Sequence, residues 1–518
     1  MPPAEVTPLA SWLTEIWRRW AGKRLVISVN AVDTQERWPT TLADLQRMQA
    51  YETYLNLFLG RHQPVFEPRR RPDEGPYVTT NILGAISRLT VHRLFGEAPR
   101  PRAKARSESL VPSAEYTTDG ADVSAQPGTR NPEQALLDFL CQSNAWQQLC
   151  YQGALGGSYR GDTVFKVRYE AARDAVIIEE VPPSCFFPER SEEQQEEIVA
   201  VSLARGLTPP SGHPSPNGRG EGGEADVAWL VEEYHTPGLI ENRLWKLIAV
   251  PGEARYLRQP VELAALAATA ELEPVVQTGL DVIPIVHIPN RKIAETGIWG
   301  QSDYVDLLSL QEALNRRKTQ TGSILDKHAD PLLAIDESFL DENRRLQMDR
   351  IRAIPLVQDE PPPQYITWDG KLADSRAEAD DLLQRILLVA GISPESFGLG
   401  RGSSAESGRA IALRQVMTTS TVAGKRLMWE PGLRKLLSIA TRMYLAHVRD
   451  RLARARALRP EEIAIEFGDG LPRDFSEAIR DEVALQGAGL ASKETSLRRL
   501  FPAWGEADVE AELKGLTS

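Results

Sequence analysis

The sequence contains little cysteine, and this excludes two common kinds of stabilising chemistry. Cys141, Cys150 and Cys185 are too few among 518 residues to form a disulfide framework. Their spacing matches no zinc-binding motif, and the seven histidines include no pair at i, i+4. We therefore expect no metal site, and assembly in a reducing compartment.

Long hydrophobic runs are also missing. No segment reaches the ~18 consecutive apolar residues of a membrane-spanning helix, and the amino terminus lacks a signal-peptide core. Leu9–Trp20, LASWLTEIWRRW, instead has the pattern of a short amphipathic helix. A helix docked on the protein surface is the commoner explanation of this pattern, and a membrane-surface anchor is the rarer one. We expect no membrane partner.

Motifs of nucleotide hydrolysis and nucleophilic catalysis are not found. A Walker A loop needs Gly-Lys followed by Ser or Thr, because the hydroxyl holds Mg²⁺. The Gly-Lys pairs at Gly22, Gly370 and Gly424 are followed by Arg, Leu and Arg. No Gly-x-Ser-x-Gly elbow is present to anchor a hydrolase triad. The sequence therefore predicts no enzyme, no catalytic residue and no cofactor.

An excess of basic residues is missing as well. The chain has 60 Lys and Arg against 72 Asp and Glu, a net charge of −12. Proteins that hold DNA tightly through its phosphates are usually basic. Any nucleic acid that meets this protein is therefore expected to be tolerated rather than gripped. The remaining composition is ordinary for a globular chain, and the length suggests three or four domains or lobes.

The first half of the chain alternates helical and strand patterns. Helices are expected over Thr41–His62 and Asn81–Pro99, the second with Asn81 as its cap and Gly96 at its end. From Asn131 a helix is expected to pass through Gly156-Gly157 into a strand at Thr163–Tyr169. More strands are expected over residues 174–181, 227–236, 242–250 and 282–290. Residues 106–131 and 205–226 are expected to be disordered loops.

The second half is predominantly helical. Ser302–Asp330 predicts a long helix ended by Pro331, and short strands are expected within Pro331–Leu372. A second helix is expected over Ala373–Ile392. A helical pattern then extends from Ser407 to about Leu458, with a break expected at Pro431-Gly432. The tail after residue 468 predicts two or three short helices.

Two glycine-rich segments could each cradle a phosphate. Gly156–Asp162, GGSYRGD, is more often a simple helix-to-strand turn. Ser396–Gln415, SFGLGRGSSAESGRAIALRQ, lies between two long helices, and an ordinary hinge explains about half of such loops. The second segment lies in a particular order of elements: helix, β module, helix, glycine loop and long helix. This order favours a specific role for the segment over a simple hinge.

This arrangement resembles the portal protein family of tailed bacteriophages, from roughly Thr41 to the carboxyl terminus. The similarity rests on several segments in order, none of them as specific as a zinc-ligand set. They are YETYLNLFLGRH, NILGAISRLTVHRLFGEAP, NAWQQLCYQGALGGSYRGDTVFKVRYE, EEVPPSCFFPE, IPIVHIPN, GQSDYVDLLSLQEALNRRKTQTGSILDKHADPLLAI, GISPESFGLGRGSSAESGRAIALRQ and GLASKETSLRRLFP.

The resemblance implies an α+β, mainly α fold with a wing, stem, clip and crown, which assembles as a ring, usually of twelve copies. Its parts are expected as follows: residues 1–296 wing, 297–330 first stem helix, 331–372 clip, 373–392 second stem helix, 393–408 tunnel loop, 409–458 long broken wing helix and 459–518 crown. The long insertion at residues 205–226 and the short crown depart from the family pattern.

The resemblance also implies particular site residues. The tunnel loop facing DNA in the channel would include Phe397, Gly398, Gly400, Arg401, Gly402, Ser403, Ser404, Ser407, Gly408 and Arg409. Small residues there can approach a duplex closely without reading its bases, whereas Arg401 and Arg409 add positive charge. The clip offers Glu337, Asp341, Asp359 and Glu360 as candidates for contact with the terminase or a connector, although a solvated loop edge explains them equally well.

The implied function is a structural portal at one capsid vertex, the channel for packaging and ejection of double-stranded DNA. Implied partners are further copies of the chain, sequence-independent DNA, the terminase large subunit, the major capsid and scaffolding proteins, and head-completion or adaptor proteins. The location would be the virion, after assembly in the host cytoplasm. A tail or baseplate adaptor ring is the alternative, and a nucleotide-dependent hydrolase is disfavoured by the missing Walker lysine and hydroxyl.

Overall fold

The computed structural model describes most, but not all, of the 518 residues. The described ranges are 37–71, 75–104, 131–191, 193, 197–207, 228–250, 254–329, 332–334, 364–366, 372–399, 413–449, 452, 455–468, 475–501 and 506–515. The chain divides into two compact units, Met1–Phe467 and Gly468–Ser518, which are taken separately below. The expected amphipathic segment Leu9–Trp20 and the expected loop at 106–131 lie outside the described residues, except for Asn131.

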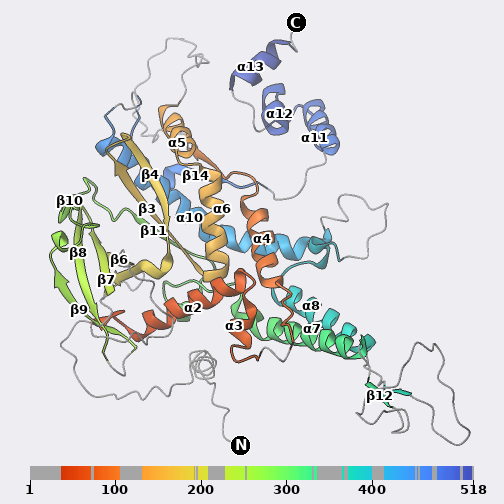
Figure 1. Ribbon diagram of the computed structural model, residues 1–518. Helices are drawn as coiled ribbons and strands as arrows, with labels where there is room; N and C mark the ends of the chain where they lie inside the picture. Colours follow the sequence, from red (N-terminus) through yellow and green to blue (C-terminus); the bar gives the residue numbers. More distant parts are fainter. Residues whose placement is uncertain are drawn as a thin grey trace, which may run out of the picture. The chain divides into compact units, whose positions relative to one another are not determined.

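A seven-stranded antiparallel sheet forms one side of the first unit (Figure 1). Its main path runs β1 (Arg37–Trp38), β9 (Tyr256–Val261), β8 (Leu239–Ile248), β7 (Ala228–Thr236), β6 (Ile198–Leu207) and β5 (Phe186–Arg190), and β10 (Val275–Gln277) also pairs with β8. The expected strands at 227–236 and 242–250 are confirmed. The expected disorder of Arg205–Leu207 is wrong, because these residues complete β6 and pair with β7.

A three-stranded sheet lies between the large sheet and the helices. It consists of β11 (Ile285–Pro289), β3 (Asp162–Glu170) and β4 (Ala175–Val181), so the strands expected in these segments are confirmed. Val164 and Ile285 pack against Val201 and Leu203 of the large sheet. Alternate side chains of β3, such as Phe165, belong instead to the main helical core, as the two-residue period of a strand requires.

One ion pair joins the two sheets within their interface. The Nζ of Lys166 lies 2.5 Å from a carboxylate oxygen of Glu233, which also accepts a hydrogen bond from His235. Burial alone would raise the pKa of Glu233, but His235 and Lys166 outweigh it and lower that pKa to about 2. Glu233 is therefore a charged, paired carboxylate at neutral pH.

The first helices begin where their sequence predicts. α2 (Leu42–Phe58) is capped by the Thr41 hydroxyl, and α4 (Ile82–Phe95) is capped by the Asn81 side chain. The short α3 (His62–Phe66) follows α2 after Gly60, which has a φ of +78°. Beyond α4, β2 (Arg100–Ala103) pairs with β14 (Ile463–Glu466), which brings the end of the first unit back to its start.

Two helices stand where one was expected before β3. α5 (Pro132–Ser143) and α6 (Trp146–Arg160) are separated at Ala145, which has a φ of +46°. The helix passes through Gly156-Gly157 as expected, and the expected helix-to-strand turn within Gly156–Asp162 falls at Gly161. A Cβ at Gly157 would lie 2.5 Å from the Thr163 hydroxyl, so the glycine permits α6 to pack tightly on β3.

The longest helix, α10 (Val416–His447), crosses this helical layer (Figure 1). It supplies Trp429, Leu433, Leu436 and Leu437 to the main core, with Phe165 and Phe95 near them. The expected break at Pro431-Gly432 is wrong, and the helix also ends earlier than Leu458. A Cβ at Gly432 would lie 2.5 Å from Ile288 Cδ1, so this glycine provides close packing against β11 and does not end the helix.

A helical hairpin extends from the layered part of the unit, with its two helices side by side (Figure 1). Its helices are α7 (Leu308–Ala329) and α8 (Leu372–Val389). Beyond the ends of the two helices, β12 (Leu332–Ala334) pairs antiparallel with β13 (Gln364–Ile366). The first helix begins later than expected, because Ser302–Leu307 form a turn and a single 3-10 turn.

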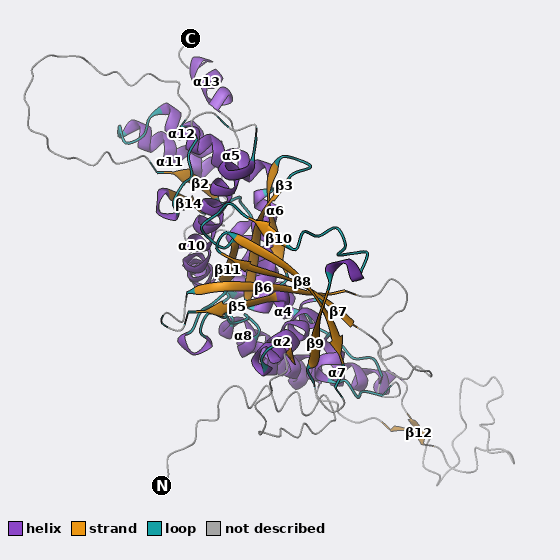
Figure 2. Ribbon diagram, turned by 90° about the vertical axis from the view of Figure 1, so that its left-hand side faces the viewer, coloured by secondary structure: helices purple, strands orange, loops and turns teal. Residues whose placement is uncertain are grey.

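The second unit contains α11 (Phe475–Gly487), α12 (Lys493–Leu500) and α13 (Glu506–Gly515). The expectation of two or three short helices in the tail is confirmed. Helices and sheets are thus both major components of the chain, and the α+β class is confirmed (Figure 2). Among the residues described, no helix is both long and apolar enough to cross a bilayer.

Candidate functional site at the base of the helical hairpin

The two hairpin helices contact each other through polar as well as apolar groups. The hydroxyls of Thr321 and Ser375 lie 2.7 Å apart, and Arg317 pairs with Glu378 at 2.7 Å. Apolar packing is concentrated at the base, where Ile386 and Leu387 are fully buried. Since most of the remaining surface of α8 is exposed, the hairpin is fixed chiefly at its base.

A second face of α7 is held by hydrogen bonds to the segment before α4. Asn315 Oδ1 accepts the backbone N–H of Thr80 at 3.0 Å and the side-chain amide of Gln311 at 2.9 Å. Thr319 Oγ1 accepts the N–H of Val78 at 3.0 Å. Three successive turns of α7 are thereby tied to one extended strand of backbone.

His62 completes this attachment from the other side. Asn315 Nδ2 donates to His62 Nδ1 at 2.8 Å, and His62 Nε2 donates to the carbonyl of Leu57 at 2.9 Å. Burial lowers the pKa of His62, which agrees with a neutral ring that both donates and accepts. Asn315 cannot reverse its amide to suit a protonated ring, because its oxygen already accepts two N–H groups.

The segment that enters α7 is connected to α10 by a buried network, here called the base network (Ser87, Ser158, Asn290, Asp303 and Lys425). Lys425 Nζ donates to both Asp303 carboxylate oxygens, at 2.7 and 2.9 Å, and to Asn290 Oδ1 at 2.6 Å. Ser158 donates to the same carboxylate at 2.6 Å and lies 2.8 Å from Ser87. Lys425 is only 6% exposed, so the pair is screened little by water.

Two glycines allow the base network to form. A Cβ at Gly300 would lie 2.0 Å from the Gly161 carbonyl oxygen, and a Cβ at Gly161 would lie 2.7 Å from the Gly300 carbonyl oxygen. The backbone entering the hairpin therefore crosses the α6–β3 turn at a distance that only glycine permits. The GGSYRGD segment thus forms a packed helix-to-strand turn and gives no support to the phosphate-cradle alternative.

The chain leaves α8 and returns to α10 through a hydrogen-bonded closure, here called the neck (Gly391, Ser393, Ser396, Thr418 and Thr421). The buried Thr418 hydroxyl accepts the N–H of Ser393 at 2.8 Å and lies 3.0 Å from the Ser396 hydroxyl. Thr421 donates to the Gly391 carbonyl at 2.8 Å. These hydrogen bonds join the described residues that follow α8 directly to the first turns of α10.

Apolar side chains are exposed around the neck. Leu388 is 66% exposed on α8, Leu399 is 52% exposed after the 3-10 turn Pro394–Phe397, and Leu413 is 64% exposed just before α10. Leu427 is 69% exposed on α10 itself. Each of these four large apolar side chains is thus more than half exposed in the single chain.

Only two of the expected tunnel-loop residues fall within the described chain. Phe397 is partly buried against the hairpin base, and Gly398 has a φ of +70°. Outside the described residues lie the other loop candidates, Gly400, Arg401, Gly402, Ser403, Ser404, Ser407, Gly408 and Arg409, and the clip candidates, Glu337, Asp341, Asp359 and Glu360. Their assignment stays a prediction.

The residues that hold this region together were not found from the sequence. In the sequence, Lys425 stands out only because it follows Gly424 in a Gly-Lys pair. Its partner Asp303 lies 122 positions away, so no local pattern links the two residues. Within the part of the chain that the structure describes, no group of His, Cys, Asp and Glu could hold a metal ion. The arrangement fixes the hairpin and the start of α10 to the same base.

Comparison with known proteins places this region within a family. Residues 269–515 match the family model described as "Phage portal protein, SPP1 Gp6-like". No curated protein matches the sequence. A solved structure described as "Neck of native GTA particle computed with C12 symmetry" is 12% identical over 70% of this chain and 83% of that chain, with a TM-score of 0.36, a value too low to support an argument.

Proposed function

Residues 269–515 belong to the phage portal family, and we propose from this premise that the chain is a structural portal subunit. Copies of the chain, twelve in the usual ring of this family, would surround a channel at one capsid vertex. Double-stranded DNA would pass through it during packaging and ejection. The chain would act by shape and position, without enzymatic activity of its own.

One observation carries the proposal: the hairpin, the neck and α10 follow each other within the matched region and share one base. In the proposed assignment α7 and α8 are the stem, and residues 331–372 are the clip at its end. Residues 393–408 are the tunnel loop, the preceding part of the chain forms the wing and residues 459–518 form the crown. The neck supports this assignment, because it holds both ends of the proposed loop at the stem base.

The exposed apolar residues support a ring of copies. Leu388, Leu399, Leu413 and Leu427 are each more than half exposed, although they lie near a well-packed base. A neighbouring copy in a ring would cover such residues, and burial of apolar surface stabilises an interface by about 25 cal/mol per Å². A monomer would leave them in water.

The proposed partners follow from the proposed position in the virion. Candidates for the clip are the terminase large subunit and then head-completion or adaptor proteins, with Glu337, Asp341, Asp359 and Glu360 as possible contacts. The wing would meet the major capsid and scaffolding proteins. In the channel DNA would be met without sequence preference by Phe397, Gly398, Gly400, Arg401, Gly402, Ser403, Ser404, Ser407, Gly408 and Arg409.

Negative-stain electron microscopy of the purified chain tests the ring. We expect rings with a central hole wide enough for a DNA duplex. A stable monomer at the concentrations of virion assembly would overturn the proposal. Measurable ATP turnover by the pure protein would contradict the non-enzymatic role.

Deletion of Gly398–Ser404 tests the loop separately from the ring. We expect rings to assemble, because the neck residues are untouched, while DNA packaging stalls. A matched control replaces Ser492 and Thr495, polar residues in the second unit, with alanine. Normal packaging by the deletion variant would show that the loop is only a hinge. It would not contradict the proposed ring.

A further inference from the structure

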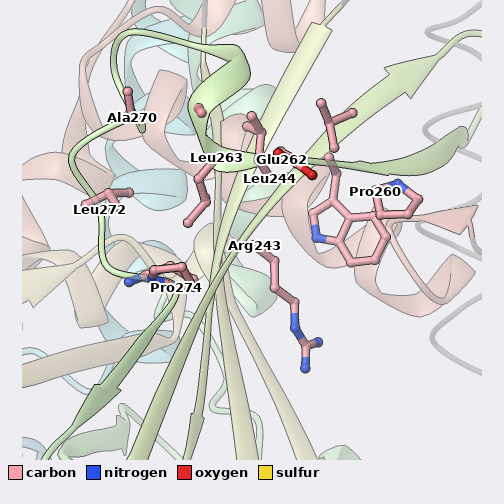
Figure 3. A pocket seen from close by; sticks show the side chains of 12 residues that line it. Arg243, Leu244, Pro260, Glu262, Leu263, Ala270, Leu272 and Pro274 are labelled. Atoms are coloured by element: carbon pink, nitrogen blue, oxygen red, sulfur yellow. The ribbon is translucent and has the colours of Figure 1, made fainter.

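A groove lies on the large sheet, in a part of the chain that the proposed function does not use. It has a volume of about 540 Å³ and is lined by residues of β8, the end of β9 and the segment that follows (Figure 3). Arg243 of β8 lies between Pro260 on one side and Leu272 and Pro274 on the other (Figure 3), and Trp245 is a further lining residue from the same strand. Most of these side chains are apolar.

The wall of the groove combines apolar surface with negative charge. Residues 262–274, ELAALAATAELEP, contain Glu262, Glu271 and Glu273 and no lysine or arginine. Leu272 is 40% exposed, and most alanines of the segment are exposed too. The one cation in the groove, among the described lining residues, is Arg243, which pairs with Glu241 at 2.7 Å. An apolar occupant that carries positive charge would fit this wall.

The sheet register shows which part of the chain approaches the groove. β1 pairs antiparallel with β9, with Arg37 opposite Leu257 and Trp38 opposite Tyr256. Arg37, at the amino-terminal end of β1, therefore lies opposite Leu257, three residues before Pro260, and Pro260 and Val261 line the groove. Sixteen residues lie between Trp20 and Arg37, so the seventeen steps from one to the other reach up to about 56 Å at 3.3 Å per step.

The sequence before Arg37 has the matching chemistry. Leu9, Trp12, Leu13, Ile16, Trp17 and Trp20 recur at helical spacing, and Arg18, Arg19, Lys23 and Arg24 follow closely. Burial would stabilise an apolar stripe with three tryptophans, and the basic residues at its end complement Glu262, which lines the groove, and the neighbouring Glu271 and Glu273. We propose that the groove binds Leu9–Trp20 of the same chain.

Two other destinations of this segment give different results in a test. A neighbouring copy could receive it, which would make the contact intermolecular. A membrane surface could receive it instead, since tryptophan and arginine suit both environments. The same-chain groove is favoured because β1, which follows this segment in the chain, pairs with β9, whose last residues line the groove.

Site-specific photo-cross-linking in the full chain tests the contact. A benzophenone amino acid replaces Leu272 in the groove or, as a control, Val275, which is 51% exposed and lies outside the groove. Equal amounts of ¹⁵N-labelled and unlabelled chains are mixed before assembly. We expect the probe at 272 to capture a peptide from residues 9–20 of its own chain, and the probe at 275 to capture none.

Hydrogen exchange of the full chain provides the second readout. In a Trp12→Gln, Trp17→Gln variant we expect the amides of residues 256–274 to exchange about tenfold faster, because they lose cover. The control variant Thr14→Gln changes the polar side of the same segment and should leave that exchange unchanged.

The proposal would be overturned by either of two findings. One is a cross-link that joins only labelled to unlabelled chains, which assigns the segment to a neighbouring copy. The other is unchanged exchange in the Trp12, Trp17 variant together with loss of its binding to anionic phospholipid vesicles. Neither finding affects the ring or the loop deletion, so this proposal and the proposed function fail separately.

Discussion

The stacked sheets and the helical hairpin are stabilised in different ways. Each strand of the three-stranded sheet buries side chains on both faces, against the large sheet on one side and α10 on the other. α8 buries only Ala379, Ile386 and Leu387 among its 18 residues. Buried side chains thus stabilise the stacked sheets along most of their length, whereas buried side chains stabilise the hairpin chiefly at its base. A substitution should therefore have an effect in the hairpin that falls steeply with distance from the base.

Lys425→Met should cause the largest loss, because it leaves the Asp303 carboxylate buried without its cation. Breaking a buried pair in this way costs about 3–5 kcal/mol of the free energy of unfolding. Urea unfolding at fixed protein concentration measures it. Arg316→Gln, which breaks the exposed pair with Glu312, is the control and should cost less than about 0.5 kcal/mol. Equal losses in the two variants would contradict the central role of the base network.

Ile386→Ala compares a buried and an exposed position of the same helix. Ile386 is fully buried at the hairpin base, and its truncation should cost about 2–5 kcal/mol. Leu388→Ala, two residues further on and 66% exposed, should change the free energy of unfolding by less than about 0.5 kcal/mol. If Leu388 proves as costly as Ile386 in the unassembled chain, the hairpin has a further contact surface.

Thr418→Val tests the neck without changing the shape of the side chain. The Ser393 N–H loses its acceptor, so we expect a loss of about 1–3 kcal/mol. Thr419→Val alters the adjacent exposed hydroxyl, which bonds only to the Gln415 carbonyl, and should be nearly neutral. Thr418→Ser should restore most of the stability, and its failure to do so would argue against the hydrogen bond as the cause.

The smallest effect concerns pH. The pKa of His62 is lowered by burial, so below about pH 6.5 the unfolded chain takes up a proton that the folded chain resists. Stability should fall as the pH drops through this range, by at most about 1.4 kcal/mol per pH unit for one group. His62→Gln should make the dependence shallower between pH 6.5 and 5. An identical slope in both proteins would show that His62 does not contribute to it.

The sequence predicted elements whose signals are local. Asn81 caps its helix as expected, and the alternating residues after Gly161 form a strand. It failed where contact with distant residues overrides a local preference. Pro431 and Gly432 suggest a break, but the apolar residues on both sides of them are buried in the main core, and α10 continues.

The sequence predicted the order of the segments that form the candidate site. It did not predict which of their side chains are in contact. The family resemblance predicted the two helices of the hairpin in their order, because each is a continuous segment, and the loop after them stays a prediction. The pairing of Lys425 with Asp303, and of Thr418 with Ser393, depends on how α10 lies against the rest of the unit. Neither pair has a spacing that a sequence pattern could indicate.

The close packing of Gly432 against Ile288 fixes the position of α10 at this point of the helix. Val416, where the helix begins beside the neck, lies 16 residues from Gly432, a lever arm of about 24 Å at 1.5 Å per residue. If α10 tilted by only ~5° about Gly432, the backbone at Val416 would move by roughly 2 Å. Gly432→Ala should therefore displace Val416 and the neck beside it, although Gly432 itself packs against Ile288 of β11.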